Sequence, residues 1–223
     1  LSDLSETTAA SQMTDTYQSL LDQYGVCAGR QSALPYSVMA ASVIYNKDIF
    51  DANGIDVPTT WDELIAACDK LKAAGIDPFY ATLASADAWT VGQGWFDYAV
   101  GGSLNVVDFY SDLAAEGTDV GPDSDVSFSK DINADARSRG YNDGNTAMAE
   151  GKAAMYLQGP WAFSEIAKTA PDGNFGTFPL PMTDDPDDLA VRVNLDLAAM
   201  IPEGSNHKEA ARAFLEYLFQ PEI

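Results

Sequence analysis

The chain has 223 residues, with 12 Lys or Arg against 34 Asp or Glu, so its formal net charge at pH 7 is −22. This charge excludes a protein that tracks nucleic-acid phosphates and disfavours one that docks on anionic lipids, because both need basic patches. It also disfavours anionic ligands relative to neutral or cationic ones, although solubility in a salty or acidic setting is the commoner reason for such a charge. An apolar fraction of 46% predicts a folded chain of one large or two small domains.

The two ends of the chain indicate a processed product or an excised piece. The sequence opens at Leu1 without a Met or a secretory signal pattern, and it stops at Ile223 just after a helical pattern. The longest stretch without charge, between Arg30 and Lys47, is too short to span a bilayer.

Helical and strand-like segments alternate along the chain, which predicts an α/β architecture. The expected helices are residues 9–24, a helix that starts at Pro58–Glu63 and is stopped by Gly75, residues 162–167 and residues 208–219, with a short one near 134–139. The expected strands are residues 42–45, 78–83, 153–157 and 191–201. Residues 116–143 are rich in Gly, Asp, Ser and Asn and are expected to form long loops, and residues 184–188 to form an exposed acidic turn.

The helix after Pro58 has the clearest start signal. Thr60 can cap its first turn while Glu63 reaches back to the cap, and Gly75 ends the apolar periodicity. In the C-terminal helix we expect Ser205 or Asn206 to be the cap. Its apolar face is expected to comprise Ala211, Phe214, Leu215 and Leu218.

The two cysteines leave the redox state open. A disulfide between Cys27 and Cys68 would close a loop of about 40 residues and contribute roughly 3–4 kcal/mol. Cys68, however, lies on the apolar face of its predicted helix, where a free buried thiol is the commoner state.

Aromatic residues are the most distinctive candidates for a binding site. Trp161 follows Gly159-Pro160 where a predicted strand gives way to a predicted helix, and ligands of α/β sheets bind at such turns. A Trp there presents a flat face suited to the apolar face of a sugar ring, so we favour a functional role for Trp161. Trp89 and Trp95 lie in a Gly-rich run with few charges, where ligand binding and core packing are equally reasonable roles. Trp61 lies on a helix face and is expected to be a core residue.

Catalytic and metal sites find less support. The single His207 stands in a turn before a helix and reads as a solvated residue, and one His with two distant Cys does not form a zinc ligand set. Residues 123–127 resemble the start of a calcium loop but lack its later Gly and acid. Paired carboxylates for glycoside hydrolysis stay open, since 34 acids make chance pairs common.

Several motifs together resemble the extracellular solute-binding proteins of sugar ABC transporters, the maltose-binding-protein-like family 1. Six pieces follow the family's order: Leu34-Pro35-Tyr36 with Val43–Phe50, Ala52–Ile55 with Pro58–Leu64, Gly101-Gly102, Gly151–Met155 with Gly159–Ala162, Phe178–Pro181, and Lys208–Leu215. The resemblance implies a periplasmic-binding-protein-like type II fold of two α/β lobes. Family members are about twice as long, so the chain is expected to be a fragment.

The resemblance also implies how the chain divides. Residues 1–37 would be a fragment of lobe one leading to the first hinge, and residues 38–190 would form lobe two. Residues 191–223 would contain the second hinge strand and a helix returning to lobe one. Closure of the lobes would be absorbed by a few residues in the strands near 36–41 and 194–199.

Candidate ligand-binding residues follow from the matching motif positions. Trp161 occupies the family's sugar-stacking position, and the aromatic run before the Gly pair supports Trp89 and Trp95. After the Pro-Leu-Pro turn, relatives often have a Gly pair where this chain has Arg192 to Asp196, so Asn194 and Asp196 are proposed as hydroxyl partners. Tyr36 of the first motif completes the set. No catalytic residue, metal or cofactor is expected.

The resemblance implies a receptor that captures a mono- or oligosaccharide non-covalently and delivers it to the membrane permease of an ABC importer. We expect a monomer at the extracellular face of the membrane, as a lipoprotein, or in the periplasm, without nucleic-acid partners. Because much of lobe one is missing, the fragment is expected to bind sugar weakly or not at all. The alternatives are a hydrolase or lyase acting on glycans, a protein-interaction module, and a binding protein for a cationic or peptide solute.

Overall fold

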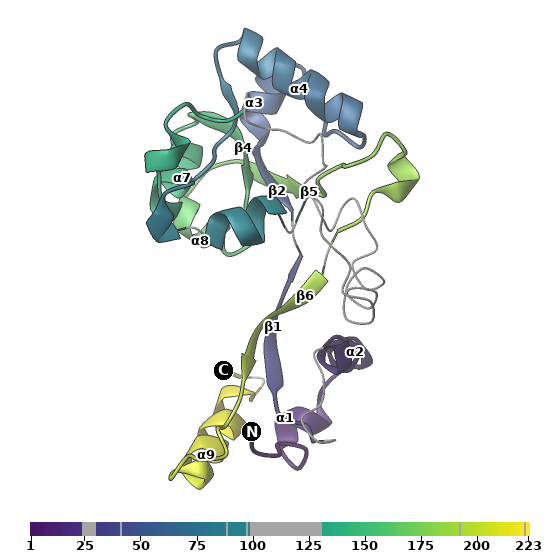
Figure 1. Cartoon of the computed structure of the whole chain (residues 1–223), viewed down its shortest axis with the longest axis vertical. Coiled ribbons are helices and arrows are strands. Elements are labelled where there is room, and N and C mark those ends of the chain that lie inside the picture. The colour runs from purple at the N-terminus through teal and green to yellow at the C-terminus, as the bar shows by residue number, and fades with distance from the viewer. Residues whose placement is uncertain are drawn as a thin grey trace. The chain divides into compact units, whose positions relative to one another are not determined.

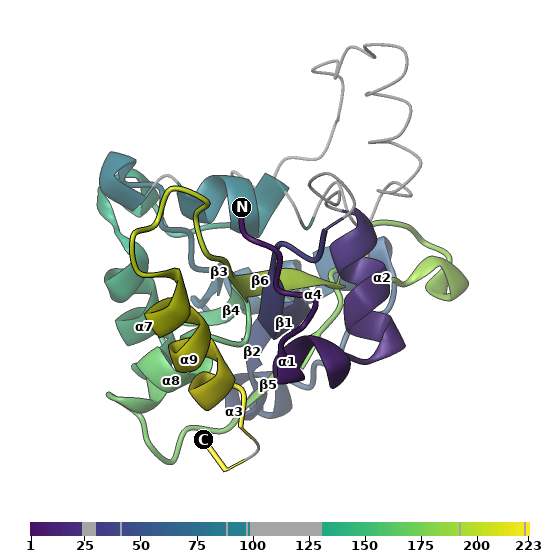
Figure 2. The same ribbon diagram turned by 90° about the horizontal axis from the view of Figure 1, so that it is seen from below.

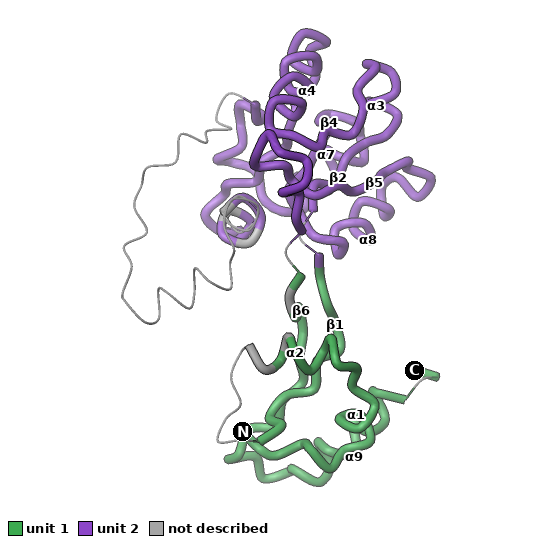
Figure 3. Tube along the Cα trace, turned by 90° about the vertical axis from the view of Figure 1, so that its right-hand side faces the viewer, with its two compact units in different colours: residues 1–39, 193–223 green, residues 40–192 purple. Residues whose placement is uncertain are grey.

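The computed structural model describes residues 1–23, 30–40, 42–87, 89–96, 98, 131–191, 193–220 and 222–223. Two compact units make up the chain (Figure 3). Unit 1 combines residues 1–39 with residues 193–223, and unit 2 is the continuous segment 40–192. The assignment of these units to two lobes of a binding protein stays a prediction.

Helices and strands alternate through unit 2 (Figure 1). The α-helices of the chain are α1 (Thr8–Ser11), α2 (Asp15–Gln23), α3 (Lys47–Ala52), α4 (Trp61–Ala73), α7 (Tyr141–Ala149), α8 (Ala162–Ala167) and α9 (Lys208–Leu218). The strands are β1 (Leu34–Ala40), β2 (Val43–Asn46), β3 (Asp77–Phe79), β4 (Ala153–Leu157), β5 (Phe175–Phe178) and β6 (Val193–Ala199). Shorter turns are the 3₁₀ segments η2 (Ser85–Asp87), η4 (Ala136–Ser138) and η5 (Pro186–Asp188), and the π-helical segment η3 (Val91–Phe96).

Unit 2 is built on a mixed four-stranded sheet in the order β3-β4-β2-β5. β3 runs parallel to β4, whereas β2 is antiparallel to both β4 and β5, with Ile44 opposite Tyr156 and Thr177. Every residue of β4 is buried, as expected for a central strand covered on both faces. This arrangement confirms the predicted α/β class.

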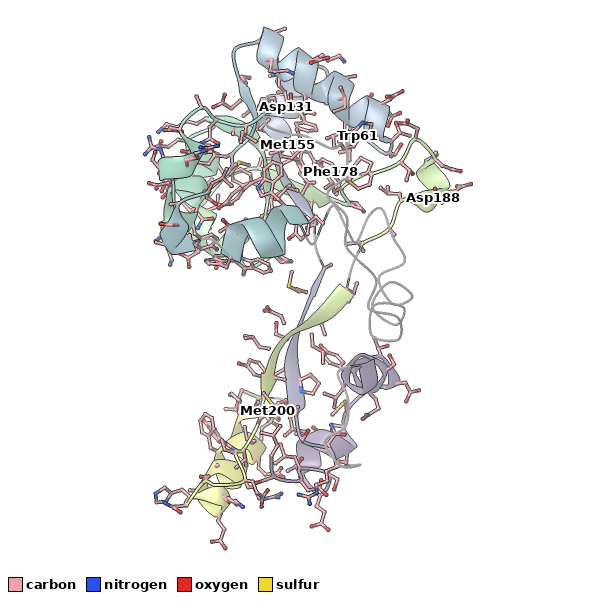
Figure 4. All side chains as sticks on the ribbon, in the orientation of Figure 1. Trp61, Asp131, Met155, Phe178, Asp188 and Met200 are labelled. Atoms are coloured by element: carbon pink, nitrogen blue, oxygen red, sulfur yellow. The ribbon has the colours of Figure 1, made fainter. Side chains whose placement is uncertain are left out.

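Two apolar clusters cover the two faces of that sheet, with α3 and α4 on one side and α7 and α8 on the other (Figure 1). The first cluster contains Leu64 and Leu71 of α4 together with Met155 and Phe178 of the sheet. Figure 4 labels Met155 and Phe178 in the interior of the unit. Trp61 packs against this cluster, in agreement with its reading as a core residue. The second cluster is formed by Tyr80 together with residues of β2, β4, α7 and α8. Figure 2 shows α7 and α8 side by side.

The start of α4 has the capping box that the sequence predicts. The Glu63 amide donates to the Thr60 hydroxyl over 3.3 Å, and the Thr60 amide donates to the Glu63 carboxylate over the same distance. Gly75, with φ of +77°, follows the helix and turns the chain toward β3. Farther along α4, Lys72 forms a 2.7 Å ion pair with the buried Asp131, which fixes the chain just before η4 to this helix.

Several elements differ from the prediction. The loop expected up to residue 143 is wrong from Tyr141 onward, because α7 begins there; residues 116–130 lie outside the described part. The strand expected over residues 78–83 is shorter, and α3 and β5 had no separate prediction. Residues 9–23 form two helices rather than one, with a break around Met13.

Unit 1 contains a two-stranded sheet of β1 and β6 and a small core. Leu4, Ala9, Leu34, Ile201 and Leu215 form that core. The cap expected at Ser205 or Asn206 is wrong: His207 stands at the cap position of α9, exposed and without a side-chain capping bond. Of the predicted apolar face of α9, Leu215 is buried, but the Phe214 side chain is 59% exposed.

Cys68 is a free, buried thiol on α4, whereas Cys27 lies outside the described residues. Among the helices that the structure describes, none has the length and apolar character needed to cross a membrane.

Candidate functional site

The turn between β4 and α8 is the strand-to-helix junction that the sequence singles out. After Leu157 the chain passes through Gln158, Gly159 and Pro160 and reaches Trp161 directly before α8. The turn is closed by two backbone hydrogen bonds, from the Ala162 amide to the Gly159 carbonyl and from the Phe163 amide to the Pro160 carbonyl, each 3.1 Å long. Trp161 is therefore carried by rigid backbone at the carboxyl end of the central strand.

The Trp161 ring is half-buried and lies back over its own turn. A Cβ atom built on Gly159 would collide with three carbons of the six-membered part of that ring, Cε3, Cζ3 and Cη2, so only glycine leaves room for it. Trp161 also packs against the cluster that contains Tyr156 and Ile166. The ring is thus supported by the core while part of it stays accessible, which suits an aromatic platform for a ligand.

The π-helical segment η3 lies against the end of β4. A Cβ atom on Gly94 would stand 2.8 Å from the Leu157 carbonyl oxygen and 3.7 Å from Nε2 of Gln158. Gln158 is buried, and among the described residues its Oε1 has no hydrogen-bond partner. A buried acceptor left open is uncommon in folded proteins, and π-helical segments occur frequently at functional sites.

Trp89 forms an aromatic pair with Tyr141, the first residue of α7. Their ring centroids are 5.1 Å apart and the ring planes are inclined by 54°. Trp89 is 37% exposed. Burial raises the pKa of the Tyr141 phenol, and the nearby Asn145 side chain partly offsets that increase. Sequence reasoning missed Tyr141, because it stands in a segment whose composition indicated a loop.

Trp95 has a more internal position than Trp89. Its ring meets Phe79 of β3 edge-on, with centroids 5.5 Å apart and planes at 62°. It is partly buried and packs against the cluster between the sheet and α4. Of the two alternatives for Trp95, this position favours core packing, and its predicted ligand contact stays a prediction.

The remaining candidates belong to unit 1. Tyr36 on β1 is 49% exposed and meets Phe219 edge-on at a centroid distance of 6.3 Å. On β6, Asp196 is exposed and its carboxylate accepts a 3.3 Å hydrogen bond from the Ser37 hydroxyl. The strand pairing thus brings the neighbourhoods of Tyr36 and Asp196 together; the side chain of Asn194 lies outside the described part.

Unit 1 also contains a cavity of about 200 Å³. Its lining is mostly apolar and consists of Ala9, Gln12, Met13, Thr14, Tyr17, Leu34, Pro35 and Phe219. No group of three or more His, Cys, Asp or Glu side chains suited to a metal ion occurs among the residues that the structure describes.

Comparison with known proteins gives a family match over nearly the whole chain. Residues 2–223 match the model of the bacterial extracellular solute-binding protein family. The multiple sugar-binding protein of Streptococcus mutans is 28% identical over 199 residues, which cover 83% of this chain and 46% of that protein. A probable sugar-binding periplasmic protein of Rhizobium meliloti is 29% identical over 198 residues, with 82% and 46% covered. The chain therefore spans about half the length of these relatives.

Solved structures of a solute-binding protein superpose on this chain and share its fold. The solute-binding protein RafE in complex with raffinose superposes with a TM-score of 0.75 at 25% identity, covering 99% of this chain and 59% of RafE. The apo form of RafE from Streptococcus pneumoniae gives a TM-score of 0.67 at 28% identity, with 99% and 58% covered. The type II binding-protein fold, of which this chain holds a part, is thereby confirmed.

Proposed function

Because the chain belongs to the family of bacterial extracellular solute-binding proteins, we propose that it is part of a receptor that binds a mono- or oligosaccharide without transforming it. Relatives named as sugar-binding proteins and the raffinose complex of RafE support a carbohydrate as ligand. The net charge of −22 agrees with a neutral ligand, since it disfavours anionic ones.

One observation carries this proposal: the Trp161 ring lies half-buried at the end of the central strand, held there by a turn that only glycine at position 159 allows. A sugar ring has an apolar face of C–H groups that can lie on an indole. Its hydroxyl groups need hydrogen-bond partners, and in the same turn the buried Oε1 of Gln158 has no partner among the described residues, so a hydroxyl that reached it would satisfy an unpaired acceptor. The exposed Trp89 beside Tyr141 adds a second aromatic surface within unit 2.

The proposed receptor acts outside the cytoplasm, either tethered to the outer face of the membrane or free in the periplasm, and hands its ligand to an ABC permease. The family name and the periplasmic relatives support this location. Ligand that contacts both lobes would favour the closed receptor over the open one, which couples binding to recognition by the permease. Tyr36 and Asp196 remain proposed ligand contacts.

Titration of the intrinsic fluorescence with a panel of neutral sugars, including raffinose, tests the proposal. Both this chain and the full-length gene product are measured, because relatives are about twice as long. We expect saturable binding by the full-length product, weaker or no binding by the chain alone, and at least a tenfold loss in Trp161→Ala, or about 1.4 kcal/mol. Tyr217→Ala, which removes an exposed aromatic ring in unit 1, serves as the control and should bind normally.

Two results would overturn the proposal. If Trp161→Ala left the sugar affinity of the full-length product unchanged, Trp161 would not be the aromatic platform for the ligand. Release of shorter saccharides from an oligosaccharide, abolished by replacing a single Asp or Glu, would instead establish an enzyme.

A further inference from the structure

Tyr141 is held through its backbone by two side chains from distant parts of unit 2. Its amide N–H donates to Oδ2 of Asp87 over 2.9 Å, and its carbonyl accepts a 3.3 Å hydrogen bond from the Tyr156 hydroxyl. Asp87 ends η2, and Tyr156 lies in β4. The first residue of α7 is therefore fixed on both sides of its Cα atom.

The Asp87 contact takes the place of a cap on α7. Position 140, directly before the helix, is a glycine and supplies no capping side chain. A Cβ atom there would collide with the Asp87 carboxylate, so the glycine is what lets this carboxylate approach the first amides of the helix. A carboxylate is favoured at a helix N-terminus, where unpaired N–H groups carry partial positive charge.

Asp87 also lies close to Trp89, because Thr90, the residue after Trp89, contacts the Asp87 backbone. The Thr90 hydroxyl lies within hydrogen-bond distance of two carbonyl oxygens, that of Asp87 at 2.9 Å and that of Thr82. Thr90 is buried, and the Asp87 amide donates to the Ala84 carbonyl over 2.9 Å. The residue that follows Trp89 is thus held close to Asp87 by its side chain.

We propose that Asp87 is a positioning residue for the binding surface of unit 2, because it sets the geometry of the Trp89–Tyr141 pair. Asp87 connects both partners: its carboxylate accepts the hydrogen bond from the Tyr141 amide, and its carbonyl lies within hydrogen-bond distance of the hydroxyl of Thr90, the residue after Trp89. Asp87 itself need not touch the ligand. The expected effect on sugar affinity rests on the proposed function, whereas the effect on the aromatic pair does not.

Near-UV circular dichroism tests the geometry of the Trp89–Tyr141 pair directly. The difference between the spectra of the unaltered chain and of Trp89→Phe defines the Trp89-dependent signal. Asp87→Ala removes the acceptor and is expected to lose at least half of that signal. Asp87→Asn keeps an amide oxygen that can accept from Tyr141 N–H, so it should retain most of the signal. Sugar affinity of the full-length product is expected to fall about tenfold in Asp87→Ala and less than threefold in Asp87→Asn.

Asp184→Ala is the matched control. Oδ1 of Asp184 accepts a 2.8 Å hydrogen bond from the Asp62 amide at the N-terminus of α4, so Asp184→Ala removes the same kind of contact from a helix other than α7. We expect this variant to keep both the Trp89-dependent signal and the affinity. Tyr156→Phe, which deletes only the hydroxyl on the carbonyl side, should lose part of the signal.

The two measurements separate the possible failures. An unchanged Trp89-dependent signal in Asp87→Ala, or an equal loss in Asp184→Ala, overturns the positioning role. A lost signal without any sugar binding by the unaltered full-length product leaves the positioning of the pair intact and contradicts the proposed function instead.

Discussion

Gly159 decides where the Trp161 ring lies, because any side chain at this position would occupy the space of the ring. Gly159→Ala is expected to push the indole out of its place against the cluster of Tyr156 and Ile166. Overpacking of this kind costs about 1–3 kcal/mol of folding free energy. We also expect a shifted Trp emission maximum and at least a tenfold lower sugar affinity of the full-length product, about 1.4 kcal/mol.

Gly204→Ala provides the comparison for this substitution. A Cβ atom at Gly204 meets nothing within 4 Å, so the methyl group should leave stability, emission and affinity close to their original values. If both alanine variants kept the original emission spectrum, the role assigned to Gly159 would be wrong.

Cys68 is expected to be chemically inert in the folded chain. Burial raises the pKa of its thiol to about 12, and the nearby Asp131 carboxylate adds to the increase. An ordinary cysteine has a pKa of about 8.5, so at pH 8 the reactive thiolate of Cys68 should be about a thousandfold scarcer.

Alkylation by iodoacetamide in a Cys27→Ser background, followed by mass spectrometry, measures this reactivity. We expect labelling of Cys68 to be slow in buffer and fast in urea, where burial is lost. Labelling at the same rate in both solutions would contradict a buried thiol.

At the scale of elements, α4 shows what local sequence can specify. The Thr60 and Glu63 pair, the acidic first turn and Gly75 all act within a few residues, so the sequence predicted the helix and its capping box. The strand β4 and helix α8 were predicted with their bounds for a similar reason, because a buried apolar run and Gly159-Pro160 mark their ends.

The helix α7 shows where local sequence fails. Asn142, Gly144 and Asn145 favour a loop, and the carboxylate that caps the helix belongs to Asp87, 54 positions earlier. No periodicity within the segment reveals that contact. The candidate site was predictable only where local sequence marks it. The motif around Trp161 predicted that residue, whereas Tyr141 was identified as a site residue only from its tertiary contacts.

The segment η3 offers a matched pair of glycines for testing its contact with β4. Gly94→Ala places a methyl group 2.8 Å from the Leu157 carbonyl oxygen, so η3 must shift away from the strand. We expect a loss of about 1–3 kcal/mol of folding free energy, as for other overpacked sites. Chemical denaturation followed by circular dichroism measures it.

Gly92→Ala lies in the same segment but meets nothing within 4 Å. Because alanine restricts the unfolded chain more than glycine, stability should stay the same or rise by up to about 1 kcal/mol. Equal destabilisation of the two variants would show that alanine disturbs η3 itself, and the inferred contact with β4 would lose its support.

At the scale of the whole chain, the two units differ in how much apolar surface they bury. Unit 2 has a cluster on each face of its sheet, whereas unit 1 has one small core. Large apolar side chains of unit 1 that are exposed include Tyr36, Val193, Leu197, Met200, Phe214, Tyr217, Leu218 and Ile223. Since burial of apolar surface supplies most of the stabilising free energy, unit 2 should be the more stable of the two.

We therefore expect the segment 40–192 to fold when it is expressed alone. It is continuous in sequence and contains its own sheet, both clusters and the aromatic residues Trp89, Tyr141 and Trp161. Its thermal unfolding should be a single cooperative transition, and its near-UV spectrum should keep the Trp89-dependent signal.

The intact 223-residue chain should lose unit 1 first, at a lower temperature than the transition of the isolated segment. Hydrogen exchange resolved by mass spectrometry locates this difference, because amides of β1, β6 and α9 should exchange faster than those of β2 and β4. A non-cooperative melt of residues 40–192, or equal protection of both strand sets, would mean that unit 2 depends on unit 1 for its stability, and the division into a strong and a weak unit would fail.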